Sequence, residues 1–136
     1  MASSIYEGSV SVARADYSHT VHDNETDKYV ELPIDGLDDR VATIATLSFT
    51  LDYPFDSPFH GTVVTDAGPT LRQIIEAVRA AYRTMYRGTV AQDLPLAGNK
   101  LVTGEYGRAF HVIEDLVIES IDIDEAAARL EIGIGS

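Results

Sequence analysis

Four arginines lie within one short segment of an otherwise acidic chain. They are Arg72, Arg79, Arg83 and Arg87. The segment from Thr70 to Gly88 contains a single acid, Glu76, so it carries a formal charge of +3 within a chain whose net charge is −12. Guanidinium groups bind carboxylates and phosphates through paired hydrogen bonds. The segment is therefore the first place to look for a binding site.

We call Arg72, Arg79, Arg83, Tyr86 and Arg87 the arginine arc. In a helix, which turns by about 100° per residue, the four arginines fall in one arc beside an apolar face, with Tyr86 at the boundary. One interpretation is a site for a carboxylate, a phosphate or an acidic protein partner. The other is an exposed face that pairs with the chain's own carboxylates, since such surface pairs are common and individually weak.

A second set of residues could form a pocket that does acid–base chemistry. Its members are His60, Tyr106, His111 and Asp115. A histidine beside carboxylates can exchange protons near neutral pH. His111 and Asp115 would share one face of a strand, but only a particular fold would bring His60 to them. This set supports the alternative that the chain is a small hydrolase or ligand-binding domain.

The sequence lacks the familiar catalytic motifs. It has no phosphate-binding glycine loop, no dinucleotide-binding glycine turn, no zinc-binding helix motif and no nucleophile elbow. His19 and His22 stand near Asp23, Glu25 and Asp27, but as a calcium loop this stretch would put Lys28 where glycine is required. We predict a solvated loop at Ser18 to Asp27, no metal site and no cofactor.

Composition restricts the partners. The acidic charge disfavours nucleic acid and anionic membranes, which bind clustered lysine and arginine. The absence of cysteine, of an apolar leader and of a membrane-spanning run predicts a cytoplasmic protein. The same acidity is also typical of proteins adapted to high salt. We expect a protein partner.

The helix also has an uncharged surface, which we call the alanine arc. It consists of Gln73, Ala77, Ala80, Ala81 and Thr84. Small side chains let another element approach closely. We predict that the chain's own loop covers this arc, with self-association as the second interpretation.

The C-terminal segment of the chain is rich in acidic residues. From Val112 to the end there are seven acids against Arg129 alone. An acidic sheet surface could contact a protein partner, or could mimic nucleic acid and block a basic protein. Simple solubility is the ordinary explanation for such a surface.

The elements that must position these residues are a helix and several strands. Thr70 as N-cap, Gln73 three residues later and Gly88 at the end predict one long amphipathic helix. Its predicted buried face is Leu71, Ile74, Ile75, Val78, Tyr82 and Met85. Alternating apolar residues predict strands at Val41 to Leu51, at Leu116 to Ile123 and at Ala128 to Ile134.

Weaker patterns add strands at Ile5 to Tyr17, at Tyr29 to Leu32 and at Phe59 to Thr65, whereas Thr89 to Gly104 reads as a loop with at most a short strand. We therefore predict one α+β domain over residues 1–136, with an antiparallel sheet of about five or six strands and the helix packed on one face. The predicted function is a non-enzymatic interaction or structural module that contacts its partner through the arginine arc or the acidic sheet surface.

Overall fold

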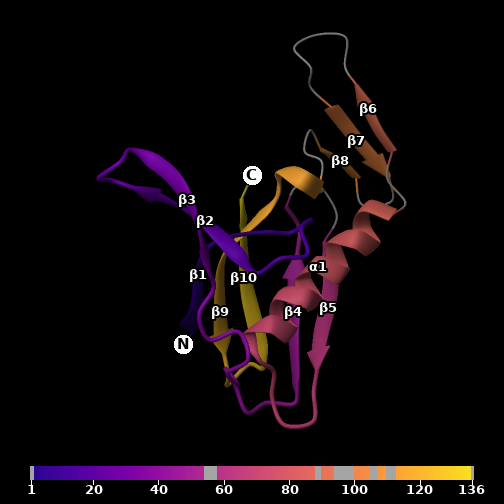
Figure 1. Ribbon diagram of the computed structural model, residues 1–136. Coiled ribbons are helices and arrows are strands. Elements are labelled where there is room, and N and C mark those ends of the chain that lie inside the picture. Colours follow the sequence, from indigo (N-terminus) through magenta and orange to yellow (C-terminus); the bar gives the residue numbers. More distant parts are fainter. Residues whose placement is uncertain are drawn as a thin grey trace.

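Seven strands form one mixed sheet in this computed structural model, which describes residues 2–53, 58–87, 90–93, 100–104, 107–109 and 113–135 (Figure 1). The strands of the main sheet are β1 (Ser3–Ser11), β2 (Ser18–Asp23), β3 (Lys28–Pro33), β4 (Thr46–Leu51), β5 (Phe59–Val64), β9 (Val117–Asp124) and β10 (Arg129–Gly135). Their order is β3-β2-β1-β9-β10-β4-β5. Within the described residues, β3 and β5 are therefore the two edge strands.

The pairing of these strands is antiparallel with one exception. β10 runs parallel to β4, and Arg129 lies opposite Ser48. β4 and β5 form the expected antiparallel pair, as do β9 and β10 across the turn that precedes Arg129. A second sheet has three strands, β6 (Val90–Asp93), β7 (Lys100–Gly104) and β8 (Gly107–Ala109), and a 3-10 helix, η1 (Ile113–Asp115), precedes β9.

The helix α1 (Leu71–Arg87) begins and ends where the sequence predicts. The Gln73 side chain accepts a hydrogen bond from the Thr70 backbone N–H at 2.8 Å, and the Thr70 hydroxyl accepts one from the Gln73 N–H at 3.2 Å. This reciprocal pair satisfies two donors that the first helical turn leaves without intrahelical acceptors. Just before the cap, Gly68 has a φ of 112°, and a Cβ there would lie 1.9 Å from the Ala42 carbonyl oxygen, so only glycine fits.

One hydrophobic core joins α1 to one face of the sheet. The predicted buried face of the helix is confirmed, since Leu71, Ile74, Ile75, Val78, Tyr82 and Met85 are all buried. They pack with alternate residues of the central strands, among them Val10, Leu47, Phe49, Ile121 and Leu130. We call this side of the sheet the helix face and the opposite side the helix-free face.

The α+β class and the packing of a helix on one sheet face are confirmed, but several details of the prediction were wrong. The sheet has seven strands and is mixed, and the helix is 17 residues, moderate in length. Ser18 to Asp23 is a strand instead of a loop, because its pairing with β3 outweighs its polar composition. Two strands, β6 and β7, lie in the stretch predicted as a loop, and β4 begins only at Thr46.

Candidate protein-binding surface

Arg79 does not lie on the exterior of the helix. Its side chain is 1% exposed, and its guanidinium donates hydrogen bonds to the Ser11 carbonyl at 2.9 and 3.1 Å and to the Asp16 carbonyl at 2.6 Å. A further bond, of 3.1 Å, reaches the Glu76 carboxylate. A buried guanidinium is tolerated only when its donors are satisfied. Arg79 thus fastens the β1–β2 connection to α1.

The other members of the arginine arc have separate environments. Arg72 forms two hydrogen bonds to Asp38, of 2.8 and 3.1 Å, and this guanidinium lowers the pKa of the Asp38 carboxyl. Arg83 is exposed, and Tyr86 is half-buried against the core. The side chain of Arg87 lies outside the described residues. The arc is therefore divided between a buried anchor, a surface ion pair and an exposed cation.

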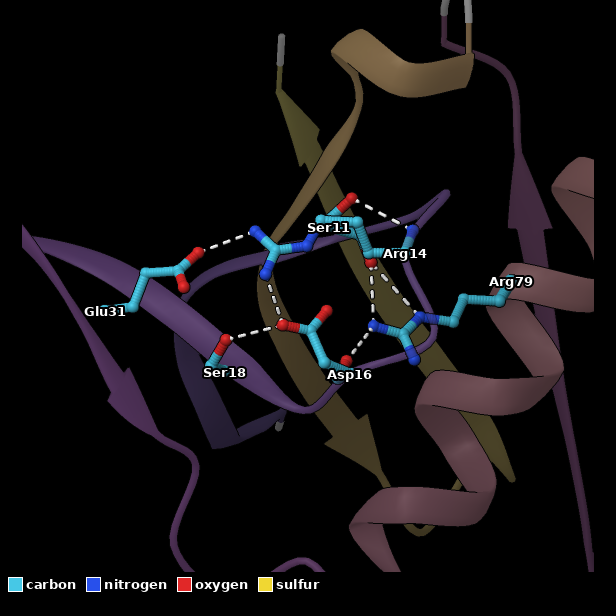
Figure 2. Close-up of polar contacts among 6 residues, drawn as sticks. All are labelled: Ser11, Arg14, Asp16, Ser18, Glu31 and Arg79. Atoms are coloured by element: carbon cyan, nitrogen blue, oxygen red, sulfur yellow. Dashed lines mark hydrogen bonds and ion pairs between the residues drawn. The ribbon is translucent and has the colours of Figure 1, made fainter.

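Polar contacts continue from Arg79 to the base of the β2–β3 hairpin (Figure 2). The Arg14 guanidinium donates to Glu31 on β3 at 2.6 Å and also to the Asp16 carboxylate. Ser18, the first residue of β2, donates to the same Asp16 carboxylate at 2.9 Å, which lowers the pKa of that carboxyl. The hairpin's orientation is thus tied, through Asp16, to the buried guanidinium of the helix.

Tyr17 completes this anchor from the side. Its hydroxyl donates to Glu76 at 2.5 Å, and its ring lies under both Arg72 and Arg79, with guanidinium carbons 4.5 and 4.9 Å from the ring centre. Desolvation tends to raise the pKa of Glu76, but the hydrogen bonds from Tyr17 and Arg79 outweigh it, so the pKa is lowered. The carboxylate of Glu76 is therefore held ionised beside the two cations.

Beyond this polar base, one side of the hairpin is apolar. Val10 on β1 pairs with His19 on β2, which pairs with Leu32 on β3. Directly opposed residues share a sheet face. Along this row the side chains pass from fully buried Val10 through half-buried His19 to Leu32, which is 45% exposed. The helix face therefore continues onto the hairpin, where Val30 is exposed beside Leu32.

The other side of β3 carries Tyr29. It pairs with His22, the two rings are 5.1 Å apart, and Tyr29 is 75% exposed. All six residues of β3 are exposed, and the hairpin extends away from the rest of the sheet and from α1 (Figure 1). We call Tyr29, Val30 and Leu32 the hairpin surface. Three large apolar side chains on one edge strand are unusual, because edges are normally shielded.

The turn of the hairpin has an ordered polar structure. The Asp23 carboxylate accepts hydrogen bonds from the Glu25 N–H and from the Thr26 hydroxyl, both of 3.0 Å, and these bonds lower its pKa. His22 contacts Asn24 and Asp27, each at 2.9 Å. No group of three or more metal-ligating side chains suited to a metal occurs in the described ranges. The acids near His22 serve the turn.

The opposite end of the sheet has a groove between α1 and β5. Two open hollows of about 400 and 420 Å³ share Thr62, Ala77 and Ala80 and so run into each other. Ala80 and Thr84 are exposed, as is Gln73, so within the described part of the chain the alanine arc is only partly covered. Arg83 also lines the groove, and Val64 on β5 is 69% exposed.

Of the four predicted pocket residues, His60 alone has its side chain within the described residues. His60 is exposed on β5, where it contacts the Thr50 hydroxyl at 3.1 Å. The backbone of Asp115 lies in η1. Tyr106 and His111, and the side chain of Asp115, fall outside the described residues. The pocket therefore stays a prediction.

The acidic sheet surface lies on the helix-free face. Asp122 pairs with Ser4 on one side and with Glu131 on the other, which sets two carboxylates on neighbouring strands. Glu119 and Glu131 are exposed. Their role toward a partner stays a prediction as well.

Sequence reasoning missed the hairpin surface and the buried state of Arg79. The alternation of Tyr29 to Leu32 was detectable, but the polarity of Ser18 to Asp27 concealed the partner strand.

In the described residues, no helix is long and apolar enough to cross a membrane. Comparison of the chain with protein-family models, with curated proteins and with solved structures found no match.

Proposed function

We propose that this chain is a non-enzymatic interaction or structural module that binds a protein partner through the hairpin surface. The observation that carries the proposal is the exposure of Tyr29, Val30 and Leu32 on an edge strand. Burying such side chains at an interface is favourable by about 25 cal/mol per Å² of apolar area. An edge strand can also hydrogen-bond to an added strand.

The anchoring of the hairpin supports this function. A surface that must meet a partner in one orientation benefits from being held before binding, because less conformational freedom is then lost. Arg14 joins β3 to the Asp16 loop, and Arg79 joins that loop to α1. The arginine arc therefore contributes to the proposed function by positioning the hairpin, with Arg83 as its exposed member.

The charged residues and the proline of β3 favour a specific partner over strand pairing with arbitrary chains. Lys28 begins the strand, Glu31 lies within it and Pro33 ends it. Charges and proline on an edge strand oppose pairing with arbitrary chains. The partner must therefore accommodate one lysine and one carboxylate beside the apolar residues.

A photo-cross-linking amino acid in place of Tyr29 tests the proposal. Irradiation of this protein, both purified and in native lysate, should yield an adduct with a polypeptide, identified by mass spectrometry. The matched control carries the cross-linker in place of Glu131, an exposed strand residue on the helix-free face. The adduct should disappear in the Val30→Ser/Leu32→Ser background. Absence of any polypeptide adduct specific to position 29 would overturn the proposal.

A further inference from the structure

We infer that the partner of the hairpin surface is a second copy of this chain, which receives β3 along the edge of its own β5, beneath its α1. This inference rests on the proposed function and deepens it by naming the occupant. β3 and β5 are the two edge strands of the described part of the sheet and lie at its opposite ends. β3 carries large exposed apolar side chains, whereas β5 borders a groove that is lined by small side chains of α1.

The two edges match on the helix face. Val30 and Leu32 stand on the side of β3 that continues the core, and α1 lies away from β3 (Figure 1). At the other end, Ala77 and Ala80 of α1 line a groove beside β5. If β3 of one copy continues the sheet at β5 of the next, then α1 of that next copy lies over Val30 and Leu32. Small alanine side chains leave room for these larger ones.

The edges also match on the helix-free face. Tyr29 is 75% exposed on β3, and Val64 is 69% exposed on β5. Both alternate with residues that face the helix side, since Val63 is buried in the core and Val30 shares a face with Leu32. Sheet continuation therefore places the two most exposed large apolar side chains of the described chain on the same face. Cross-strand contact between such residues stabilises sheets.

Charge favours this arrangement in spite of the acidity of the whole chain. The hairpin turn carries Asp23, Glu25 and Asp27, whereas the groove is lined by exposed Arg83. Glu76, the acid of the groove, already bonds to Arg79 and Tyr17. The end that is inserted is thus acidic, and the receiving end presents a cation.

The geometry determines the type of assembly. The two surfaces lie at opposite ends of one molecule, so each copy offers one hairpin and one groove. Such a head-to-tail contact is heterologous and produces a ring if the rotation closes or an open chain if it does not. A closed two-fold dimer through two hairpins is the competing arrangement, and it makes no use of the groove.

Two blocking variants distinguish these arrangements. Leu32→Glu places a charge on the hairpin and leaves the groove intact, whereas Ala80→Glu places a charge in the groove and leaves the hairpin intact. Both positions are exposed, and circular dichroism melting should show that both variants fold as the wild type does. Sedimentation velocity over a concentration series should show wild-type species larger than a dimer and a monomer for each variant alone.

An equimolar mixture of the two variants should then form a heterodimer and nothing larger, because one intact hairpin meets one intact groove. A mixture that stays monomeric, or an Ala80→Glu variant that assembles as the wild type does, would overturn the inference. So would a wild-type chain that is monomeric throughout the series. An adduct at position 29 with a different protein would then still support the proposed function, which fails only if no polypeptide adduct forms.

Discussion

The base and the outer strand of the β2–β3 hairpin are built in opposite ways. At the base, Arg14 donates to the Asp16 carboxylate, and the buried guanidinium of Arg79 donates to the Asp16 carbonyl. On the outer strand, Val30 and Leu32 expose apolar surface, and neither is part of the hydrophobic core. The contrast shows that the fold fixes the direction of an exposed apolar surface, which is what the proposed binding function requires.

The buried anchor gives the largest expected effect. Arg79→Met removes the donors of two backbone carbonyls and the cation beside Glu76, so it should lower the free energy of unfolding by about 3 kcal/mol. Chemical denaturation measures this loss. Arg83→Met on the same helix is the control and should change stability by less than about 0.5 kcal/mol, because Arg83 is exposed. Equal losses would remove the distinction between the two arginines.

The cross-strand row of Val10, His19 and Leu32 gives the next largest effect. Val10→Ala should cost about 2 kcal/mol, because it opens a cavity in the core. Leu32→Ala, at the exposed end of the same row, should cost less than about 0.5 kcal/mol in the monomer. Thermal melts of dilute samples compare the two. A large loss from Leu32→Ala would show that this side chain serves folding and would count against an interface there.

The bridge at the base should act locally. Arg14→Ala removes exposed ion pairs, so global stability should change little. Hydrogen exchange should nevertheless accelerate in β2 and β3 and remain unchanged in β9 and β10, because only the hairpin loses its link to the Asp16 loop. Uniform acceleration across the sheet would contradict a positioning role for Arg14.

The smallest expected effect is a dependence on pH. The lowered pKa of Glu76 means that its ionised form stabilises the fold above the unfolded pKa of about 4.3, and that this contribution is lost as pH falls through the lower folded value. Glu76→Gln should therefore lose less stability than the wild type between neutral pH and acid. Denaturant midpoints over that range measure the difference, and parallel curves would exclude Glu76 as a contributor.

The helix and its buried face followed from sequence because capping and the spacing of apolar residues are local properties. Thr70 and Gln73 sit three residues apart, and this spacing alone determines their reciprocal hydrogen bonds. The burial of Arg79 depends instead on carbonyls of Ser11 and Asp16, more than 60 residues away. Helical geometry places Arg79 at the border of the apolar face, but periodicity contains no information about such distant acceptors.

Among the strands, too, local features could be predicted and long-range contacts could not. The alternation in β9 and β10 predicted both strands, because one face of each is buried. β2 has no buried residue, so its sequence shows no alternation of hydrophobic residues that would indicate its pairing with β3. The parallel contact of β10 with β4 joins residues about 80 positions apart and was equally invisible. The candidate surface was therefore missed, since it depends on which strand lies at the sheet edge.

The central claim is that the hairpin surface is covered by a polypeptide when the protein functions, and the absence of native cysteine permits a direct test. Leu32→Cys and Glu131→Cys each introduce a single thiol on an exposed strand residue. Their alkylation rates would be measured in dilute purified protein and in native lysate, each relative to a small-molecule thiol. We predict that Leu32→Cys reacts about tenfold more slowly in lysate while Glu131→Cys is unchanged, as expected for an interface that is mostly occupied. A Leu32→Cys rate in lysate as fast as that of the purified monomer would contradict the claim.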